Sequence, residues 1–384
     1  MSSLLHPSPA GALPFSDYVE LTADAIRERT WAAKRTLGRR AVILGHHYQR
    51  ESVMEFADFR GDSYKLSQLA ASQTDAEYIV FCGVHFMAES ADVLRQPHQS
   101  VVIPDLKAGC SMADMAAIED VEEAWERLQR VHGDTLTPVT YMNSTAALKA
   151  FCGARGGVVC TSSNAATVLA WAWERKPRVF FFPDQHLGRN TSVAMGLPLD
   201  ALAEWEFRVR ELDAFNARCF RPETRVVLWR GWCSVHGKFT LEQIHAERAA
   251  DPSVRILVHP ECPFDVVQNA DRVGSTEFII DQVRGAAPGT HWAIGTEINL
   301  VHRLALEHPD QRIHSLQTNV CPCATMNRID PAHLLWTLEN LVDGHAVNVV
   351  RVPDDVKRDA RVALDRMLAL KGDGQVARAT MSED

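Results

Sequence analysis

The sequence lacks any uninterrupted apolar run of the roughly 18 residues that a membrane-spanning helix needs. Its first residues, MSSLLHPSPAGALPF, lack the basic start and the long apolar stretch of a signal peptide. Positive charge is not in excess, because the 40 Lys and Arg residues are outnumbered by 49 Asp and Glu residues, which gives a net charge of −9. A general nucleic-acid binder needs a basic face. These absences predict a cytoplasmic protein that binds neither membranes nor nucleic acids.

Two familiar motif classes are also missing. The Gly-rich stretches GARGG and GTHWAIGTE form neither a phosphate-binding loop nor a dinucleotide fingerprint. The nine cysteines are odd in number, and Cys110, Cys233 and Cys321 lie too far apart for the paired spacing of a structural zinc site. A reducing compartment disfavours a disulfide framework. The cysteines are therefore expected to be buried apolar residues or metal ligands.

What is present is a globular composition with a strongly alternating pattern. Hydrophobic residues make up 46% of the 384 residues and charged residues 23%. Short apolar runs such as AVILGHH, RVFFFPD and HWAIG alternate with longer helical patterns such as SYKLSQLAAS. Alternation of continuous apolar strands with helices predicts an α/β fold with parallel sheets covered on both faces. Several small sheets are more plausible than one large sheet.

A weak internal repeat indicates three such units. The units open at AVILGHHY, PVTYMN and RILVHPE, and each closes at a cysteine, in VVIPDLKAGC, RVVLWRGWC and HSLQTNVC. The middle unit is longer, which fits a helical insertion around LPLDALAEWEFRVRELDAFNARC. We expect αβα domains over residues 1–111, 112–233 and 234–329. Residues 1–20 are expected to be flexible, and the helices of 330–370 to pack back on the first domain.

Each unit opens with two polar residues, two positions apart, at the end of an apolar strand. Positions i and i+2 of a strand point to the same face, and sites in open α/β sheets gather at the carboxyl ends of strands. One such pair is more often a strand cap, but three equivalent pairs indicate a site. The pairs are His46 with Tyr48, Tyr141 with Asn143, and His259 with Glu261.

Hydroxyl residues precede three of the expected helices. A helix N-terminus favours carboxylates and phosphates, although Ser and Thr also serve there as ordinary caps. Together they would suit a substrate with several negative charges. The hydroxyl residues considered for binding are Ser63, Ser162, Ser275 and Thr276.

Three cysteines close the three units in loops marked by Gly or Pro: Cys110, Cys233 and Cys321. Iron–sulfur clusters take thiolates, usually four, and three would leave one iron open to act as a Lewis acid. On spacing alone, zinc is an equal alternative. His236 follows Cys233 in the same loop and is expected to reach the same site. Burial is expected for Cys82, Cys152, Cys160 and Cys262, whereas Cys219 lies in the expected insertion and Cys323 stays open.

The ordered set of motifs from residue 40 to residue 328 resembles the quinolinate synthase family of bacterial NAD biosynthesis. The matching stretches are GHHYQ, GDSYKLS, DLKAGCSMADM, TYMNSTAALKA, VVCTSSNA, FFPDQHLGRN, WCSVHGKFT, VHPECP, VGST, IGTEINLVHRL and CPCATMNRI. No single motif is specific, but their combined order is.

The resemblance implies a pseudo-threefold arrangement of three αβα domains around an oxygen-sensitive 4Fe–4S cluster. It also implies a transferase that condenses iminoaspartate with dihydroxyacetone phosphate to quinolinate, phosphate and water. The implied cluster ligands are Cys110, Cys233 and Cys321, with Cys321 preferred to Cys323 because it aligns with the cysteine before proline. The implied site residues are His46, Tyr48, Ser63, Tyr141, Asn143, Ser162, His236, His259, Glu261, Ser275 and Thr276.

Among these residues, Glu261 beside His259 is expected to act as general acid and base, with His46 also catalytic and Tyr48 assisting isomerisation. A functional link to L-aspartate oxidase is plausible. Two other classes remain: a redox or sensing iron–sulfur protein, and a zinc-dependent lyase. The three polar pairs argue against the redox protein, since an electron carrier needs no substrate residues.

Overall fold

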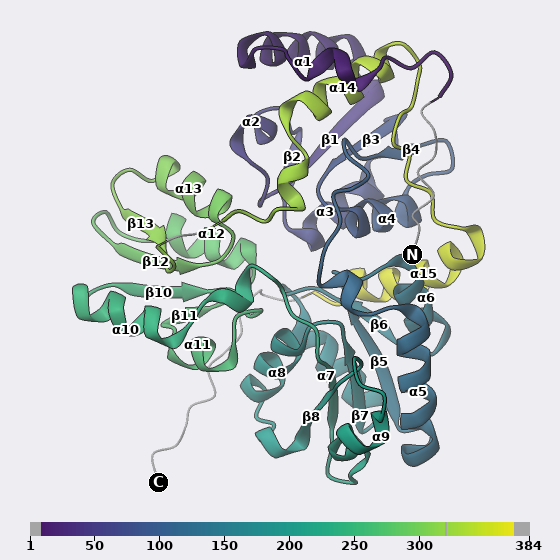
Figure 1. Ribbon diagram of the computed structural model, residues 1–384, viewed down its shortest axis with the longest axis vertical. Helices are drawn as coiled ribbons and strands as arrows, with labels where there is room; N and C mark the ends of the chain where they lie inside the picture. The colour runs from purple at the N-terminus through teal and green to yellow at the C-terminus, as the bar shows by residue number, and fades with distance from the viewer. Residues whose placement is uncertain (1–8, 319–320, 372–384) are drawn as a thin grey trace. The chain divides into compact units, whose positions relative to one another are not determined.

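The chain is described here by a computed structural model that covers residues 9–318 and 321–371 (Figure 1). These residues divide into two units. Unit 1 comprises residues 1–110 and 322–354, and unit 2 comprises residues 111–321 and 355–384, as far as each is described. Every pairing between named strands is parallel, as the continuous apolar runs predict.

Unit 1 contains a four-stranded sheet in the order β2-β1-β3-β4. Its central strands are buried on both faces, because helices pack on each side. The strands are β1 (Ala41–His46), β2 (Phe59–Gly61), β3 (Tyr78–Cys82) and β4 (Ser100–Val102). The helices are α1 (Ala23–Leu37), α2 (Glu51–Met54), α3 (Ser63–Ser72), α4 (His85–Leu94) and α14 (Pro331–Val342).

The beginning of the described chain packs on α14 within unit 1. The Tyr18 hydroxyl donates to Glu339 at 2.6 Å, and the Trp336 indole donates to the Leu13 carbonyl at 2.7 Å. The Phe15 ring stacks on His333, with the ring centroids 4.1 Å apart. Residues 1–8 of the segment that was expected to be flexible lie outside the described residues.

Unit 2 begins with a five-stranded sheet in the order β6-β5-β7-β9-β8. Helices α5 and α6 pack together on one face, and α7 and α8 on the other (Figure 1). The strands are β5 (Leu136–Tyr141), β6 (Val158–Cys160), β7 (Arg178–Phe182), β8 (Leu202–Trp205) and β9 (Val226–Trp229). The helices are α5 (Ile118–His132), α6 (Ala146–Ala154), α7 (Ala165–Arg175), α8 (Gln185–Ala194), α9 (Leu212–Phe215) and α15 (Asp354–Ala369).

Close backbone approach fixes α15 against α6. A Cβ atom on Gly153 would lie 1.8 Å from the Asp359 carbonyl oxygen, so only glycine fits there. The Asn164 amide also donates to the Leu370 carbonyl at 2.9 Å. Of the two C-terminal helices, α14 therefore lies in unit 1 and α15 in unit 2.

The last sheet of unit 2 has the order β11-β10-β12-β13. Figure 1 shows α10 and α11 on one face and α12 and α13 on the other. The strands are β10 (Arg255–Val258), β11 (Arg272–Val273), β12 (His291–Gly295) and β13 (Arg312–Ser315). The helices are α10 (Leu241–Ala250), α11 (Phe264–Asn269), α12 (Thr276–Arg284) and α13 (Ile298–Glu307).

The two four-stranded sheets share one strand order, and the first three strands of the five-stranded sheet follow it too, with the first strand of each sheet second from the edge. This confirms the α/β class and the small parallel sheets. The expected helical insertion in the middle unit was partly wrong, because it contains the edge strand β8 as well as short helices. Leu202, Ala203 and Trp205 are buried in that strand while Glu204 is exposed, a pattern that fits a half-covered strand.

The stretch SMADMAAIEDVEEAWERLQRV has a helical pattern from its first residues, but the helix starts later. A short 3-10 turn, Ala113–Met115, comes first, and α5 begins at Ile118. The Met115 carbonyl accepts a hydrogen bond from the Trp229 indole at 2.8 Å instead of from a helical amide. Among the described residues, none of the helices has both the length and the apolar character needed to cross a membrane.

Candidate functional site

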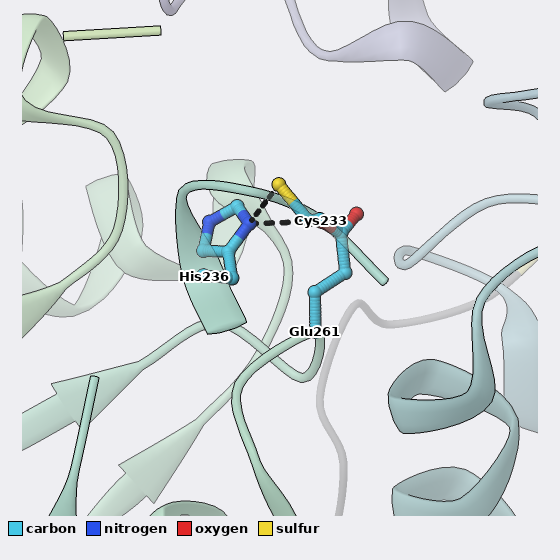
Figure 2. Close-up of side chains that lie close together, drawn as sticks. All are labelled: Cys233, His236 and Glu261. Atoms are coloured by element: carbon cyan, nitrogen blue, oxygen red, sulfur yellow. Dashed lines mark hydrogen bonds and ion pairs between the residues drawn. The ribbon is translucent and has the colours of Figure 1, made fainter. Parts of the chain in front are cut away.

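The candidate site lies at the carboxyl ends of strands in unit 2. Figure 2 shows three of its side chains, Cys233, His236 and Glu261, pointing toward one another. Cys233 and His236 come from the loop after β9, and Glu261 from the loop after β10. Their sulfur, nitrogen and oxygen atoms lie within 4.8 Å of one another, so these residues could hold a metal ion.

The loop after β9 is held by close backbone contacts. A Cβ on Gly231 would lie 2.3 Å from the Pro183 carbonyl oxygen, so glycine lets this loop approach the end of β7. The Gly237 amide then donates to the Cys233 carbonyl at 2.9 Å. These contacts turn the chain so that Cys233 and His236 face the same side.

The Glu261 carboxylate accepts two hydrogen bonds although it is only 2% exposed. The Tyr141 hydroxyl donates to Oε1 at 2.5 Å, and His236 Nδ1 lies 2.8 Å from Oε2. Burial acts to raise the pKa of Glu261, but the charge of His236 and these hydrogen bonds outweigh it and lower the pKa below the ordinary value. Glu261 is therefore an ionised carboxylate at neutral pH.

The hydrogen bonds of His236 determine its tautomer. Nδ1 carries the proton that Glu261 accepts, so in the neutral ring Nε2 accepts from the Thr296 hydroxyl at 3.1 Å. The same Nδ1 lies 3.3 Å from Cys233 Sγ. His236 thus links the carboxylate, the thiol and the end of β12.

His259 stacks on His236, with ring centroids 4.4 Å apart and planes 21° from parallel. Its Nδ1 accepts the backbone N–H of Glu261 at 3.3 Å. Burial lowers the pKa of His259 to about 3, and His236 acts in the same direction. His259 is therefore neutral, and its Nε2 carries a proton that it can donate to a substrate oxygen.

The first polar pair repeats this local geometry inside unit 1. The Tyr48 backbone N–H donates to His46 Nδ1 at 3.2 Å, as the Glu261 N–H does to His259. The His46 and Tyr48 rings meet edge to face, with centroids 4.8 Å apart. Equivalent pairs in two units therefore present a histidine in the same way at a strand end.

The hydroxyl residues occupy the positions that the pattern indicated, with one difference. Ser275 caps α12 by accepting the Phe278 amide at 3.3 Å, and Thr276 and Ser162 are buried near strand ends. Ser63 is the first residue of α3, and Asp62 provides the cap instead. The Asn143 amide oxygen is buried, and within the described residues it has no hydrogen-bond partner. The site prediction as a whole stays a prediction.

The cysteines differ clearly in their exposure. Cys110 and Cys233 are partly exposed and Cys321 is exposed. Burial raises the pKa of both Cys82 and Cys219 to about 12, so these thiols stay protonated. The four cysteines for which burial was expected are buried, namely Cys82, Cys152, Cys160 and Cys262, and the structure shows that Cys219 is buried too.

The loop that carries Cys110 is anchored within unit 1. Asp105 Oδ1 accepts the Lys107 amide at 2.8 Å, and Asp105 Oδ2 accepts from Arg328 at 2.8 Å. Next to Arg328, the Asn327 backbone amide donates to the Cys323 carbonyl at 2.9 Å. The Asp105–Arg328 ion pair therefore joins the loops that contain Cys110 and Cys323.

Sequence reasoning missed two residues next to the candidate site. Thr296 follows β12 directly, so the rule for strand ends could have found it. Asp184 is fully buried and caps α8 by accepting the Leu187 amide at 2.7 Å. Burial raises the pKa of Asp184 well above its ordinary value, and the charge of Glu261 acts in the same direction. The Pro-Asp dipeptide between β7 and α8 was the available signal.

Comparison with known proteins gives one consistent family. A family model described as "Quinolinate synthetase A protein" matches residues 29–369. A quinolinate synthase of Anoxybacillus flavithermus is 52% identical over 352 residues, which cover 92% of this chain and 95% of the relative. Those of Bacillus subtilis and Bacillus licheniformis are 50% and 49% identical, over 92% and 96% of this chain and 95% and 99% of the relatives.

Proposed function

The chain belongs to the quinolinate synthase family, and from this premise we propose how it makes quinolinate for NAD biosynthesis. In the proposed reaction, iminoaspartate condenses with dihydroxyacetone phosphate, and one phosphate and two waters leave for each quinolinate formed. Atoms balance without an oxidant or reductant. The enzyme is therefore a transferase whose steps are condensation, isomerisation and dehydration.

The group formed by Tyr141, His236 and Glu261 beside Cys233 carries this proposal. The condensation requires removal of a proton from the carbon next to the imine of iminoaspartate. Glu261 is suited to this because Tyr141 and His236 keep its carboxylate ionised and fixed in one orientation. His259 stacks alongside and offers Nε2–H to an oxygen that gains negative charge.

We propose that Cys110, Cys233 and Cys321 hold a 4Fe–4S cluster. Their exposure fits this role, because a ligand must be an accessible thiolate. In the cluster-free chain, burial raises the pKa of the five other thiols. When bound, a cluster with three thiolate ligands supplies an iron with an open position, which serves as a Lewis acid.

The substrates carry carboxylates and a phosphate, so the site needs several donors for anions. Ser275 and Thr276 stand at the N-terminus of α12, where backbone N–H groups and the helix dipole favour negative oxygens. Ser162 and Asn143 follow two neighbouring strands of the five-stranded sheet and are proposed to bind a second anionic group. Asn143 would bind this group through its NH₂, because the amide oxygen can only accept hydrogen bonds.

Unit 1 is proposed to contribute His46, Tyr48 and Ser63 to substrate binding, and a pseudo-threefold arrangement of the three sheets is part of the proposal. The common order of the first three strands in each sheet and the repeated His46 and His259 geometry support it. Tyr48 is proposed to assist isomerisation of the triose-derived carbons. His46 would present Nε2–H, because its Nδ1 already accepts the Tyr48 amide.

We further propose a cytoplasmic location and a supply of iminoaspartate from L-aspartate oxidase. The location is supported by the nine cysteines, all within the described residues, none of which forms a disulfide. The supply follows from the substrate, since iminoaspartate is the product of aspartate oxidation.

Anaerobic purification with iron and sulfide analysis tests the cofactor. We expect a brown protein with a broad visible band and about four irons per chain. Quinolinate should then change the electron paramagnetic resonance spectrum of the reduced protein. A colourless protein that binds zinc through Cys233, His236 and Glu261 would contradict the cluster and favour a zinc-dependent lyase.

A further inference from the structure

A second group of titratable residues lies in the last sheet of unit 2, away from the candidate site. His291 begins β12, and His314 lies on β13 opposite Ala293. Residues 291 and 293 share one face of the strand, because side chains alternate along it. The two histidines are therefore diagonal neighbours on one face. The end of α10 supplies two carboxylates there, from Glu247 and Asp251.

These four side chains form a continuous row, here called the histidine tetrad. Asp251 Oδ2 lies 2.6 Å from His291 Nδ1, and Glu247 Oε2 lies 2.9 Å from His314 Nε2. Between the rings, His291 Nε2 faces His314 Nδ1 at 3.4 Å. Each histidine therefore has a carboxylate at one nitrogen and the other histidine at the second.

Counting protons shows that this row needs a cation between the rings. Each carboxylate accepts an N–H, which places the proton of His291 on Nδ1 and that of His314 on Nε2. In two neutral rings, the facing nitrogens are then both lone pairs and repel each other. Either a shared proton or a metal ion must lie between them.

We propose that the histidine tetrad binds one divalent transition-metal ion, such as Zn²⁺, through His291 Nε2 and His314 Nδ1. Ligand bonds of 2.0–2.1 Å in a tetrahedral site place two nitrogens about 3.3–3.4 Å apart. The observed 3.4 Å fits that spacing and is long for a hydrogen bond between nitrogens. Imidazole nitrogens suit zinc, copper and nickel.

The carboxylates act as the orienting groups that such ligands usually have. Metal-bound histidines almost always donate their other N–H to a carboxylate, carbonyl or water. Asp251 is itself fixed, because its Oδ1 accepts the Ser253 hydroxyl and amide at 2.6 and 2.9 Å. Arg312 lies 3.8 Å from Asp251 and offsets part of its charge. The remaining charge of the carboxylates favours a cation.

The two rings differ in exposure, so an ion can enter from the side of His314. The His291 side chain is 7% exposed and that of His314 is 40% exposed. Solvent can therefore reach His314 and supply water as the further ligands. The tetrad is also distant from the candidate site, since Thr296 comes five residues after His291, roughly 16 Å along an extended strand.

Zinc binding to the cluster-loaded enzyme tests the proposal, because the proposed cluster ligands are then occupied. Equilibrium dialysis under anaerobic conditions would compare the wild type with His314→Gln, His291→Gln and Asp251→Asn. The control is His302→Gln, which changes an exposed histidine on α13. We expect the wild type and the control to bind one more zinc ion per chain than His314→Gln and His291→Gln.

The Asp251→Asn variant should bind that ion about 10–100-fold more weakly, the usual cost of losing an orienting partner. Thermal unfolding should shift upward with zinc only in the proteins that bind the extra ion. His314 is partly exposed, so His314→Gln should fold even if the more buried His291→Gln does not. Equal zinc binding by wild type and His314→Gln would overturn the proposal, and would mean that the rings share only a proton.

Discussion

Replacing Glu261 by Gln gives the sharpest view of the candidate site, because it changes charge and almost nothing in shape. In the folded chain both carboxylate oxygens accept from donors, Tyr141 at one and His236 at the other. An amide has one accepting oxygen and one NH₂ group. The Tyr141 hydroxyl can turn to accept from the NH₂ group while the amide oxygen accepts from His236 Nδ1, so both hydrogen bonds lose their charged partner.

The size of the effect follows from these contacts. A hydrogen bond to a charged group contributes about 1.5–3 kcal/mol and a neutral one about 0.5–1.5 kcal/mol, so loss of the charge at both contacts should lower the free energy of unfolding by about 2 kcal/mol. A general base typically accelerates a reaction about 10²–10⁴-fold. Turnover should therefore fall by about 10² or more while most of the protein stays folded.

The assay is anaerobic formation of quinolinate from both substrates, with iron content and thermal unfolding measured on the same samples. Tyr141→Phe is the matched comparison, because it removes one hydrogen bond and keeps the carboxylate. Glu261→Gln should retain the cluster and lose more activity than Tyr141→Phe. If Glu261→Gln with a full cluster turns over at a near-normal rate, Glu261 is not the base.

Three further predictions concern the cysteines and pH. The cluster should be lost or badly damaged in Cys110→Ser, Cys233→Ser and Cys321→Ser. Iron content should stay near that of the wild type in Cys82→Ser and Cys219→Ser. Loss of the cluster in Cys323→Ser but not in Cys321→Ser would reassign the third ligand. In cluster-free protein, iodoacetamide should modify Cys110, Cys233 and Cys321 well before Cys82 and Cys219. The pKa of about 12 keeps the last two thiols protonated and unreactive. Equal rates of modification, measured by mass spectrometry, would contradict this. Burial lowers the pKa of His259 to about 3 and that of His186, in the first turn of α8, to about 4, so both bind protons mainly after unfolding. The free energy of unfolding should therefore fall as pH drops from 6.5 toward 4, and His186→Gln should flatten that slope.

The strand and helix pattern could be predicted because the parallel strands are buried on both faces. Continuous apolar runs such as RVFFFPD and HWAIG are typical of central strands between helix layers, and they form β7 and β12. The edge strands β2 and β11 were missed, since each is short and partly exposed. The edge strand β8 was missed because its surroundings contain charged residues that favour a helical interpretation.

The sequence identified several residues that the structure brings together, but not the hydrogen bonds between them. Strand ends and paired positions pointed to Tyr141, His259 and Glu261, because these follow directly from local geometry. The sequence placed Glu261 beside His259, whereas its carboxylate bonds to Tyr141 at the end of β5 and to His236 in the loop after β9. Contacts between different sheets depend on tertiary packing, and no local pattern encodes them. For the same reason Thr296 was found only in the structure.

The most direct measurement is turnover by the cluster-loaded enzyme under anaerobic conditions, with iminoaspartate, dihydroxyacetone phosphate and no reductant or oxidant. Because the overall reaction is balanced without electron transfer, we predict sustained formation of quinolinate with one phosphate released for each product. The cluster's visible spectrum should remain unchanged throughout. Quinolinate that appears only in proportion to an added reductant, or none at all with an intact cluster, would contradict the account.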